Sequence, residues 1–199
     1  MVYRIPAVNL VGRGCLAQLK DEIGTLGCKK ALVVSDKFLT ENGVVEKVTK
    51  VLDQVGIEHT LYNDVKQNPS VANVEGGLEV LKKENCDFIV SIGGGSPQDC
   101  GKAISVLATN GGKITDYEGV NKSQKKCLPI VAIATTAGTS AEVTINYVIT
   151  DEETHIKMIM VDRNTLASIT VNDPELMLSK PAGLTAATGM DALTHAMEA

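Results

Sequence analysis

The chain has 199 residues, of which 44% are hydrophobic and 22% are charged, and its formal net charge is −5. This composition is typical of a globular protein that can build a sizeable core. An acidic chain with two Phe, four Tyr and no Trp is not expected to bind nucleic acid or an anionic membrane surface.

Apolar runs alternate with helical patterns over the first 140 residues. Strands are predicted over 31–35, 57–62, 88–92 and 129–135, and helices over 43–55, 71–84 and 97–109. The order is typical of a parallel sheet with helices on both faces, a Rossmann-like α/β fold. Ligands of such sheets bind at the carboxyl ends of the strands, so the turns that follow the strands are the candidate sites.

Two polar side chains follow the first two predicted strands, Asp36 and Asn68. At the end of a dinucleotide-binding sheet, an acidic side chain can accept hydrogen bonds from both hydroxyls of the adenosine ribose and repel a 2′-phosphate. Taken alone, Asp36 is more often a solvent-facing turn residue, and Asn68-Pro69 is a turn dipeptide. Beside a nucleotide, Asn68 could contact the ribose or the adenine.

A glycine turn, Gly93-Gly94-Gly95, follows the third predicted strand and precedes a helix. Ser96 is predicted to be the N-cap of that helix, with Pro97 at its first position. Glycine lets another group approach the backbone closely, and the start of a helix offers free N–H groups and a positive dipole end. The run therefore predicts an anion site suited to a phosphate. A tight connection without a ligand is the alternative.

The fourth predicted strand leads into a threonine turn, residues 135–140. Hydroxyls of Thr135, Thr136 and Thr139 could hydrogen-bond a pyrophosphate or a nicotinamide amide. Ser and Thr in turns often satisfy nearby backbone groups instead. Several glycine- or hydroxyl-containing turns at successive strand ends nevertheless favour a shared ligand.

Three charged side chains near these turns have two interpretations each. Asp99 and Lys102, on the helix after the glycine turn, could line the same cleft or form an (i, i+3) surface pair. Lys157 lies on a predicted hairpin strand, where it could reach the cleft or be exposed to solvent.

The pattern changes after residue 140. A hairpin is predicted over 143–150 and 157–161, another strand over 167–171, and an alanine-rich helix from about residue 181. The helical pattern runs to residue 199 without a glycine cap or a proline, so we expect the chain to be cut inside a helix.

Asp191 and His195 are four residues apart and share one face of that helix. A carboxylate and an imidazole there could bind one divalent cation, but catalytic metal sites usually have at least three protein ligands. In isolation, the pair is more often a helix-surface contact or includes a satisfied core histidine.

Cysteines and apolar runs indicate the compartment. Five cysteines are scattered without a C-x-x-C pair, which predicts free thiols in a reducing environment. The N-terminus has no apolar leader core, and no apolar run approaches the roughly 18 residues of a membrane span. We therefore expect a cytoplasmic protein.

Four motifs in this order resemble the iron-containing (group III) alcohol dehydrogenases, the family of lactaldehyde reductase and 1,3-propanediol dehydrogenase. They are Asp36 after a strand, Gly-Gly-Gly-Ser-Pro-Gln-Asp over 93–99, Thr-Thr-Ala-Gly-Thr-Ser over 135–140 and Gly-Met-Asp-Ala-Leu-Thr-His over 189–195. The resemblance covers essentially the whole chain but only about the first half of such an enzyme.

The resemblance implies a dinucleotide-binding α/β domain over 1–180, and over 181–199 the first helix of a truncated helical, metal-binding domain. It places NAD on ten residues: Gly94, Gly95 and Ser96 at the pyrophosphate, Asp36 and Asn68 at the adenosine end, Thr135, Thr136, Thr139 and Lys157 towards the nicotinamide, and Asp99 in the same cleft. The acidic residue favours NAD over NADP.

The resemblance also makes Asp191 and His195 two of four ligands to Fe²⁺, which Zn²⁺ replaces in some relatives; the other two are histidines further along such enzymes. It implies oxidation of a small primary alcohol or diol to an aldehyde by hydride transfer to NAD, in a homo-oligomer such as a dimer. With half of the metal site missing, we expect this chain alone to be inactive. Alternatives are a metal- and NAD-dependent lyase similar to dehydroquinate synthase, or a non-catalytic NAD-binding module.

Overall fold

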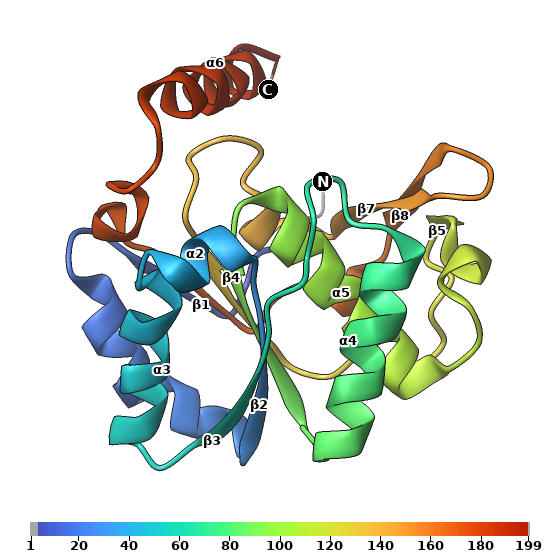
Figure 1. Ribbon diagram of the computed structural model, residues 1–199, viewed down its shortest axis with the longest axis horizontal. Helices are drawn as coiled ribbons and strands as arrows, with labels where there is room; N and C mark the ends of the chain where they lie inside the picture. The colour runs from blue at the N-terminus through green and yellow to red at the C-terminus, as the bar shows by residue number, and fades with distance from the viewer. Residues whose placement is uncertain (1–3, 199) are drawn as a thin grey trace.

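The computed structural model describes residues 4–198, and its centre is a six-stranded sheet (Figure 1). The strand order is β1-β9-β6-β4-β2-β3, and all neighbouring strands are parallel. The strands are β1 (Val8–Val11), β2 (Lys30–Val34), β3 (Glu58–Tyr62), β4 (Phe88–Gly93), β6 (Ile130–Ala134) and β9 (Ile169–Asn172). The predicted strands of this sheet are confirmed, and β1 is an edge strand that the sequence patterns did not reveal.

Helices cover both faces of the sheet, as predicted. They are α1 (Leu19–Glu22), α2 (Lys37–Glu41), α3 (Val44–Gln54), α4 (Val71–Glu84) and α5 (Gly95–Asn110). A further helix, α6 (Ala182–Glu198), does not cover the sheet. Short 3₁₀ helices lie in the connections between the elements: η1 (Cys15–Gln18), η2 (Ile23–Leu26), η3 (Ile114–Tyr117), η4 (Ala141–Val143), η5 (Arg163–Thr165) and η6 (Pro174–Met177).

Alternation along the buried strands explains the two apolar layers. In β2, Ala31 and Val33 pack into the cluster with α3, whereas Leu32 and Val34 pack into the cluster with α4 and α5. Successive side chains of a strand point to opposite faces, so a fully apolar strand needs a helical layer on each side. The short apolar runs predicted as buried strands meet this requirement.

A second, three-stranded sheet lies beside α5 (Figure 1). Its order is β5 (Gly119–Val120), β8 (Ile156–Val161) and β7 (Asn146–Asp151). β7 and β8 pair antiparallel, which confirms the predicted hairpin, and β5 joins β8 in parallel.

The last helix, α6, stands away from the sheet at the top of Figure 1. No residue of α6 is buried, and Leu184, Met190, Leu193 and Met197 are exposed. The helix predicted from residue 181 is confirmed. Its assignment to a separate domain stays a prediction, and residues 1–3 and 199 of the two predicted domains lie outside the described residues. Within residues 4–198 no helix combines the length and the apolar character needed to cross a membrane.

The start of α5 differs from the prediction. Gly94 is the N-cap and the helix begins at Gly95, so the boundary lies two residues earlier than predicted. Ser96 and Pro97 are the second and third residues of the helix. No side chain caps this end. The Ser96 hydroxyl instead accepts a hydrogen bond from the Asn68 N–H, with an N to O distance of 3.3 Å.

The chain order creates a switch point between β2 and β4. From β2 the chain moves outward to β3, and then crosses to the other side of β2 to form β4. Connections on the two sides of such a point leave a crevice at the carboxyl ends of the strands. Asp36 follows β2 and the glycine turn follows β4, so the topology brings these two predicted features to one crevice.

Close packing of α4 on α5 generates a stability prediction. A methyl group at Gly77 would overlap Ile104 Cδ1 and lie 3.2 Å from Tyr62 Cδ1. Because overpacking a tight interface typically costs about 1–3 kcal/mol, Gly77→Ala should lower the free energy of unfolding by that amount in urea titrations. Gly24→Ala is the control, since a methyl there meets nothing within 4 Å. Equal stability of Gly77→Ala and the wild type would contradict this packing.

Candidate functional site

A cleft of about 450 Å³ opens at the carboxyl ends of β2, β4 and β6. It contains six residues that the sequence predicts for the cofactor site: Asp36, Gly94, Gly95, Ser96, Thr135 and Thr136. Segments that are 58 residues apart (Asp36 and Gly94) and 39 residues apart (Ser96 and Thr135) in sequence therefore meet at one crevice, as the switch point requires.

The glycine turn presents bare backbone to this cleft. Gly93 has φ 153°, and a Cβ there would clash with the Pro97 ring, whose Cβ would be 2.9 Å away. A Cβ on Gly95 would meet no protein atom within 4 Å, so the backbone there faces open space. The N–H groups of the first helical turn have no intrahelical acceptor. Gly95 and Ser96 therefore offer donors at the positive end of a 16-residue helix.

Gln98 holds the two strand ends beneath the turn. Its side chain is buried, Nε2 donates to Ile133 O at 3.0 Å, and Oε1 accepts from Ser91 Oγ. Thr135 N donates to Gly93 O at 3.1 Å. Together these contacts tie β4, the end of β6 and the start of α5 to one another, and satisfied buried polar groups of this kind fix a local geometry.

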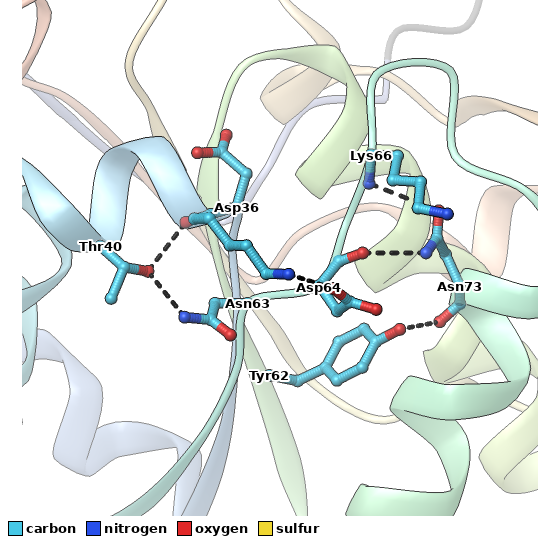
Figure 2. Close-up of polar contacts among 8 residues, drawn as sticks. Asp36, Thr40, Tyr62, Asn63, Asp64, Lys66 and Asn73 are labelled. Carbon is cyan, nitrogen blue, oxygen red and sulfur yellow. Dashed lines mark hydrogen bonds and ion pairs between the residues drawn. The ribbon is translucent and has the colours of Figure 1, made fainter.

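Asp36 caps α2 and also lines the cleft. Its Oδ1 accepts a hydrogen bond from Leu39 N at 2.8 Å, the contact of an N-cap residue. Figure 2 shows the carboxylate pointing away from Asn63 and Asp64. The cap orients the carboxylate and leaves Oδ2 available to a ligand, so the turn role and the ligand role of Asp36 are compatible.

The segment between β3 and α4 is tied down by a polar network (Figure 2). Tyr62 OH donates to Asn73 O at 2.8 Å, and Asn73 Nδ2 donates to Asp64 O at 2.9 Å. Burial raises the pKa of Tyr62 to about 12, so its hydroxyl remains a donor over the physiological range. The network holds the loop that carries Asn68.

A second cavity of about 190 Å³ shares Gly95 and Ser96 with the cleft and adds Asn68 and Asp99. Asn68 adopts φ 55°, a conformation that Asn tolerates better than most residues. Lys157 Nζ donates to Asn68 Oδ1 at 3.0 Å, so the hairpin lysine reaches this cavity's edge through Asn68.

Asp99 and Lys102 are not an exposed surface pair, because Lys102 is buried and Asp99 is half-buried where it lines the second cavity. Lys102 is only 1% exposed, and Asp99 accepts a hydrogen bond from Val148 N at 3.1 Å. Burial raises the pKa of Asp99 to about 6, against the opposing effect of Lys102. Burial lowers the pKa of Lys102 to about 8, against the opposing effects of Asp99 and Glu142.

The threonine turn divides into two parts. Thr135 and Thr136 line the cleft, and Thr136 also lies against Gly94, where a Cβ would be 3.1 Å from Thr136 Oγ1. Thr139 is exposed and lines neither cavity. The structure therefore does not bring Thr139 together with the other predicted contacts.

Asp191 and His195 lie on one face of α6, with Asp191 Oδ1 3.6 Å from His195 Nε2. A methyl on Gly138 would be 3.3 Å from Asp191 Oδ2, so the threonine turn approaches this helix. Carboxylate oxygen and imidazole nitrogen suit Fe²⁺ or Zn²⁺. Over residues 4–198, however, no three His, Cys, Asp or Glu side chains gather as a metal site.

Several residues that line the cleft carry no functional signal in the sequence patterns. They include two cations, Lys66 and Lys180, and an apolar wall: Phe38, Leu39, Val65, Leu176 and Leu184. Lys66 follows β3 and Lys180 follows β9, so both obey the strand-end rule. Lys180 was not found because its position depends on β9 lying beside β6, which the chain order does not reveal.

Fold and site together define an open, parallel α/β protein with a ligand crevice at its switch point. The family model of iron-containing alcohol dehydrogenase matches residues 6–174. The chain belongs to this family.

Individual proteins with similar sequences or structures are consistent with this family assignment. Alcohol dehydrogenase 4 of Schizosaccharomyces pombe is 54% identical over 197 residues, which cover 99% of this chain and 47% of that protein. The NAD-dependent methanol dehydrogenase of Bacillus methanolicus is 46% identical, with coverage of 99% and 52%. The crystal structure of a 1,3-propanediol oxidoreductase superposes with a TM-score of 0.96 at 46% identity, covering 98% of this chain and 51% of the other. The chain spans about half the length of the curated relatives it matches.

Burial of Asp99 generates a pH prediction. A raised pKa means that ionisation disfavours the folded state, so the cost is absent below the unfolded pKa of 3.8 and complete above about pH 6. Asp99→Asn keeps an acceptor for Val148 N and removes this cost. The unfolding free energy of the variant should rise relative to wild type by about 3 kcal/mol between pH 3.5 and 7. Denaturant titrations across this range measure it, and a difference independent of pH would refute the assignment.

Proposed function

We propose that this chain binds NAD with its pyrophosphate on the N–H groups of Gly95 and Ser96. The carrying observation is the first turn of α5, where a bare glycine backbone, unused donors and a helix dipole face one cleft. These are the features that a doubly negative pyrophosphate requires. The name of the Bacillus methanolicus relative, an NAD-dependent enzyme, supports the same cofactor.

The remaining cleft residues give the cofactor a direction. Asp36 is assigned to the adenosine end, and Thr135 and Thr136, which follow β6 on the other side of β4, are assigned to the nicotinamide end. Asn68 lines the second cavity rather than the cleft of Asp36 and accepts a hydrogen bond from Lys157, so these two residues belong to one end of the site and not to opposite ends. Lys157 acts at this site through Asn68, and Thr139 is the weakest member of the proposed set because it lines neither cavity.

Asp36 is proposed to select NAD over NADP. Its free carboxylate oxygen can accept hydrogen bonds from ribose hydroxyls, whereas a 2′-phosphate there would bring two negative charges together. Because Leu39 N holds Oδ1, the carboxylate enters the cleft with little freedom to turn away.

The whole protein is proposed to be an alcohol dehydrogenase that converts a small primary alcohol or diol to an aldehyde. Asp191 and His195 would hold Fe²⁺, or Zn²⁺ in its place, as two of its ligands. A divalent metal held there would supply Lewis acidity towards an alcohol oxygen, and bound NAD would supply the hydride acceptor. The chain's own residues would bind and orient the cofactor, and the approach of Gly138 to Asp191 supports a position of the threonine turn beside the proposed metal ligands.

Further expectations accompany this function. We propose a cytoplasmic homo-oligomer, such as a dimer, with an α/β domain up to residue 180 and a helical metal-binding domain beyond it. The five free cysteines, four of them buried, suit a reducing compartment. The named relatives are alcohol dehydrogenases, which favours this activity over a lyase similar to dehydroquinate synthase. The pair of metal ligands within residues 4–198 favours cofactor binding without turnover by this chain.

Fluorescence titration with NADH tests the cofactor site. The wild-type chain should bind NADH but should not reduce NAD with 1-propanol or 1,2-propanediol in the presence of Fe²⁺. Gly95→Ala should weaken NADH binding at least tenfold, since its methyl group would occupy the space proposed for the pyrophosphate. The melting temperature of this variant should be unchanged or slightly higher than that of the wild type. Gly24→Ala is the matched control. Unchanged NADH affinity in Gly95→Ala would refute the pyrophosphate site at Gly95 and Ser96. Clear turnover would show that metal ligands beyond Asp191 and His195 are dispensable.

The cofactor preference is tested at Asp36. Asp36→Ala should weaken NADH binding more than NADPH binding. It should also lower the free energy of unfolding by about 1 kcal/mol, because it removes the N-cap of α2. Asp36→Asn separates the two effects, because Asn caps helices well but carries no charge. It should retain stability and still narrow the preference for NADH. Titration of both variants with both cofactors decides the matter, and an equal loss of NADH and NADPH affinity would count against the ribose contact.

A further inference from the structure

Lys102 is a buried ammonium whose three N–H donors all have backbone or hydroxyl acceptors. Nζ donates to Ala141 O and Asn146 O, each at 2.7 Å, and to Thr144 Oγ1 at 3.2 Å. Short contacts of this kind are charge-assisted hydrogen bonds. The side chain extends from the middle of α5 to another segment of the chain, and none of its three acceptors is a predicted cofactor residue.

The segment that Lys102 holds, residues 141–146, connects two walls of the proposed site. The threonine turn lies immediately before it, and β7 of the hairpin begins at Asn146. One helical turn earlier on α5, Asp99 accepts from Val148 N at 3.1 Å. The helix thus holds carbonyl oxygens of the segment with one side chain and an N–H group of the adjoining strand with another.

Burial lowers the pKa of the Lys102 amine to about 8, and two nearby carboxylates oppose this shift. Asp99 on α5 and Glu142 on η4 face the amine and favour the ammonium, while burial opposes it. Three oxygen acceptors need three donors, and only the protonated amine has three. An apolar side chain of similar length would remove the charged donor from the Ala141 and Asn146 carbonyl groups, which would keep the Thr144 hydroxyl as a weaker donor at 3.2 and 3.4 Å.

We propose that Lys102 is a positioning residue for the nicotinamide half of the cofactor. By fixing residues 141–146, it would hold the threonine turn and the hairpin at the spacing that the nicotinamide half needs, without touching the cofactor. The adenosine half depends on Asp36 and the glycine turn, which Lys102 does not contact. This inference rests on the proposed NAD function and extends it to a residue outside the cleft.

A comparison of two ligands tests the proposal, because ADP contains the adenosine diphosphate half of NADH and lacks the nicotinamide half. Lys102→Met should weaken NADH binding about tenfold and change ADP affinity less than twofold in the 199-residue chain, because the Ala141 and Asn146 carbonyl groups lose their charged donor. Lys83→Met, at an exposed position on α4, is the control and should change neither. Equal weakening of both ligands, or unchanged NADH affinity, would overturn the positioning role.

Hydrogen exchange without cofactor provides an arm that does not depend on NAD binding. Lys102→Met should speed amide exchange over residues 137–148 at least tenfold and leave β4 and β6 unchanged. Unaltered exchange over 137–148 would overturn the proposal. If the wild type binds neither ligand, the proposed function fails, and this arm still decides whether Lys102 holds the segment.

A milder variant covers the case in which Lys102→Met does not fold. Thr144→Val removes the hydroxyl acceptor and leaves both carbonyl contacts in place. It should weaken NADH about two- to threefold, leave ADP unchanged, and speed exchange in the same segment to a smaller extent. The opposite pattern, with ADP affected and NADH not, would contradict the proposal.

Discussion

The buried amide of Gln98 joins two parallel strands at the point where both of them end. Its Nε2 donates to the last carbonyl but one of β6, and its Oε1 accepts from Ser91 in β4. Because Gln98 belongs to the first turn of α5, the same contacts fix where that helix begins relative to the sheet. The distance between the glycine turn and the threonine turn follows from them. A cleft that must meet a rigid ligand at several points needs its walls held in this way.

Helix α5 then serves the site along much of its length. The first helical turn presents unpaired N–H groups to the cleft, and the middle of the helix holds residues 141–148 through Lys102 and Asp99. The interior of the helix is correspondingly polar for a buried element: Gln98, Lys102 and Ser105 are all buried. Buried polar groups are tolerated when their partners are complete, and the partners here are backbone groups of the segments that surround the cleft. Stability and site geometry therefore depend on the same contacts.

Local patterns in the sequence were sufficient to predict the residues of the site that directly follow strands. Asp36, the glycine turn and Thr135 were found because apolar runs mark strands and parallel strands end at one edge. The N-cap was misplaced at Ser96 because its hydroxyl is used by Asn68, 28 residues away. Gln98 and Lys102 could not be assigned, since their acceptors lie 35 to 44 residues further along the chain. Thr139 belongs to the same motif as Thr135, yet the turn carries it out to solvent, which no local spacing indicates.

The central claim is that the first N–H groups of α5 receive the cofactor's pyrophosphate, and amide NMR addresses it residue by residue. In a titration of the ¹⁵N-labelled chain with NAD, the largest shifts should occur at Gly95 and Ser96, with smaller shifts at Thr135 and Thr136. Backbone donors that gain a charged acceptor change their resonance strongly, so this result would place the phosphates on the helix start. Saturable binding that leaves the Gly95 and Ser96 amides unshifted would contradict the account.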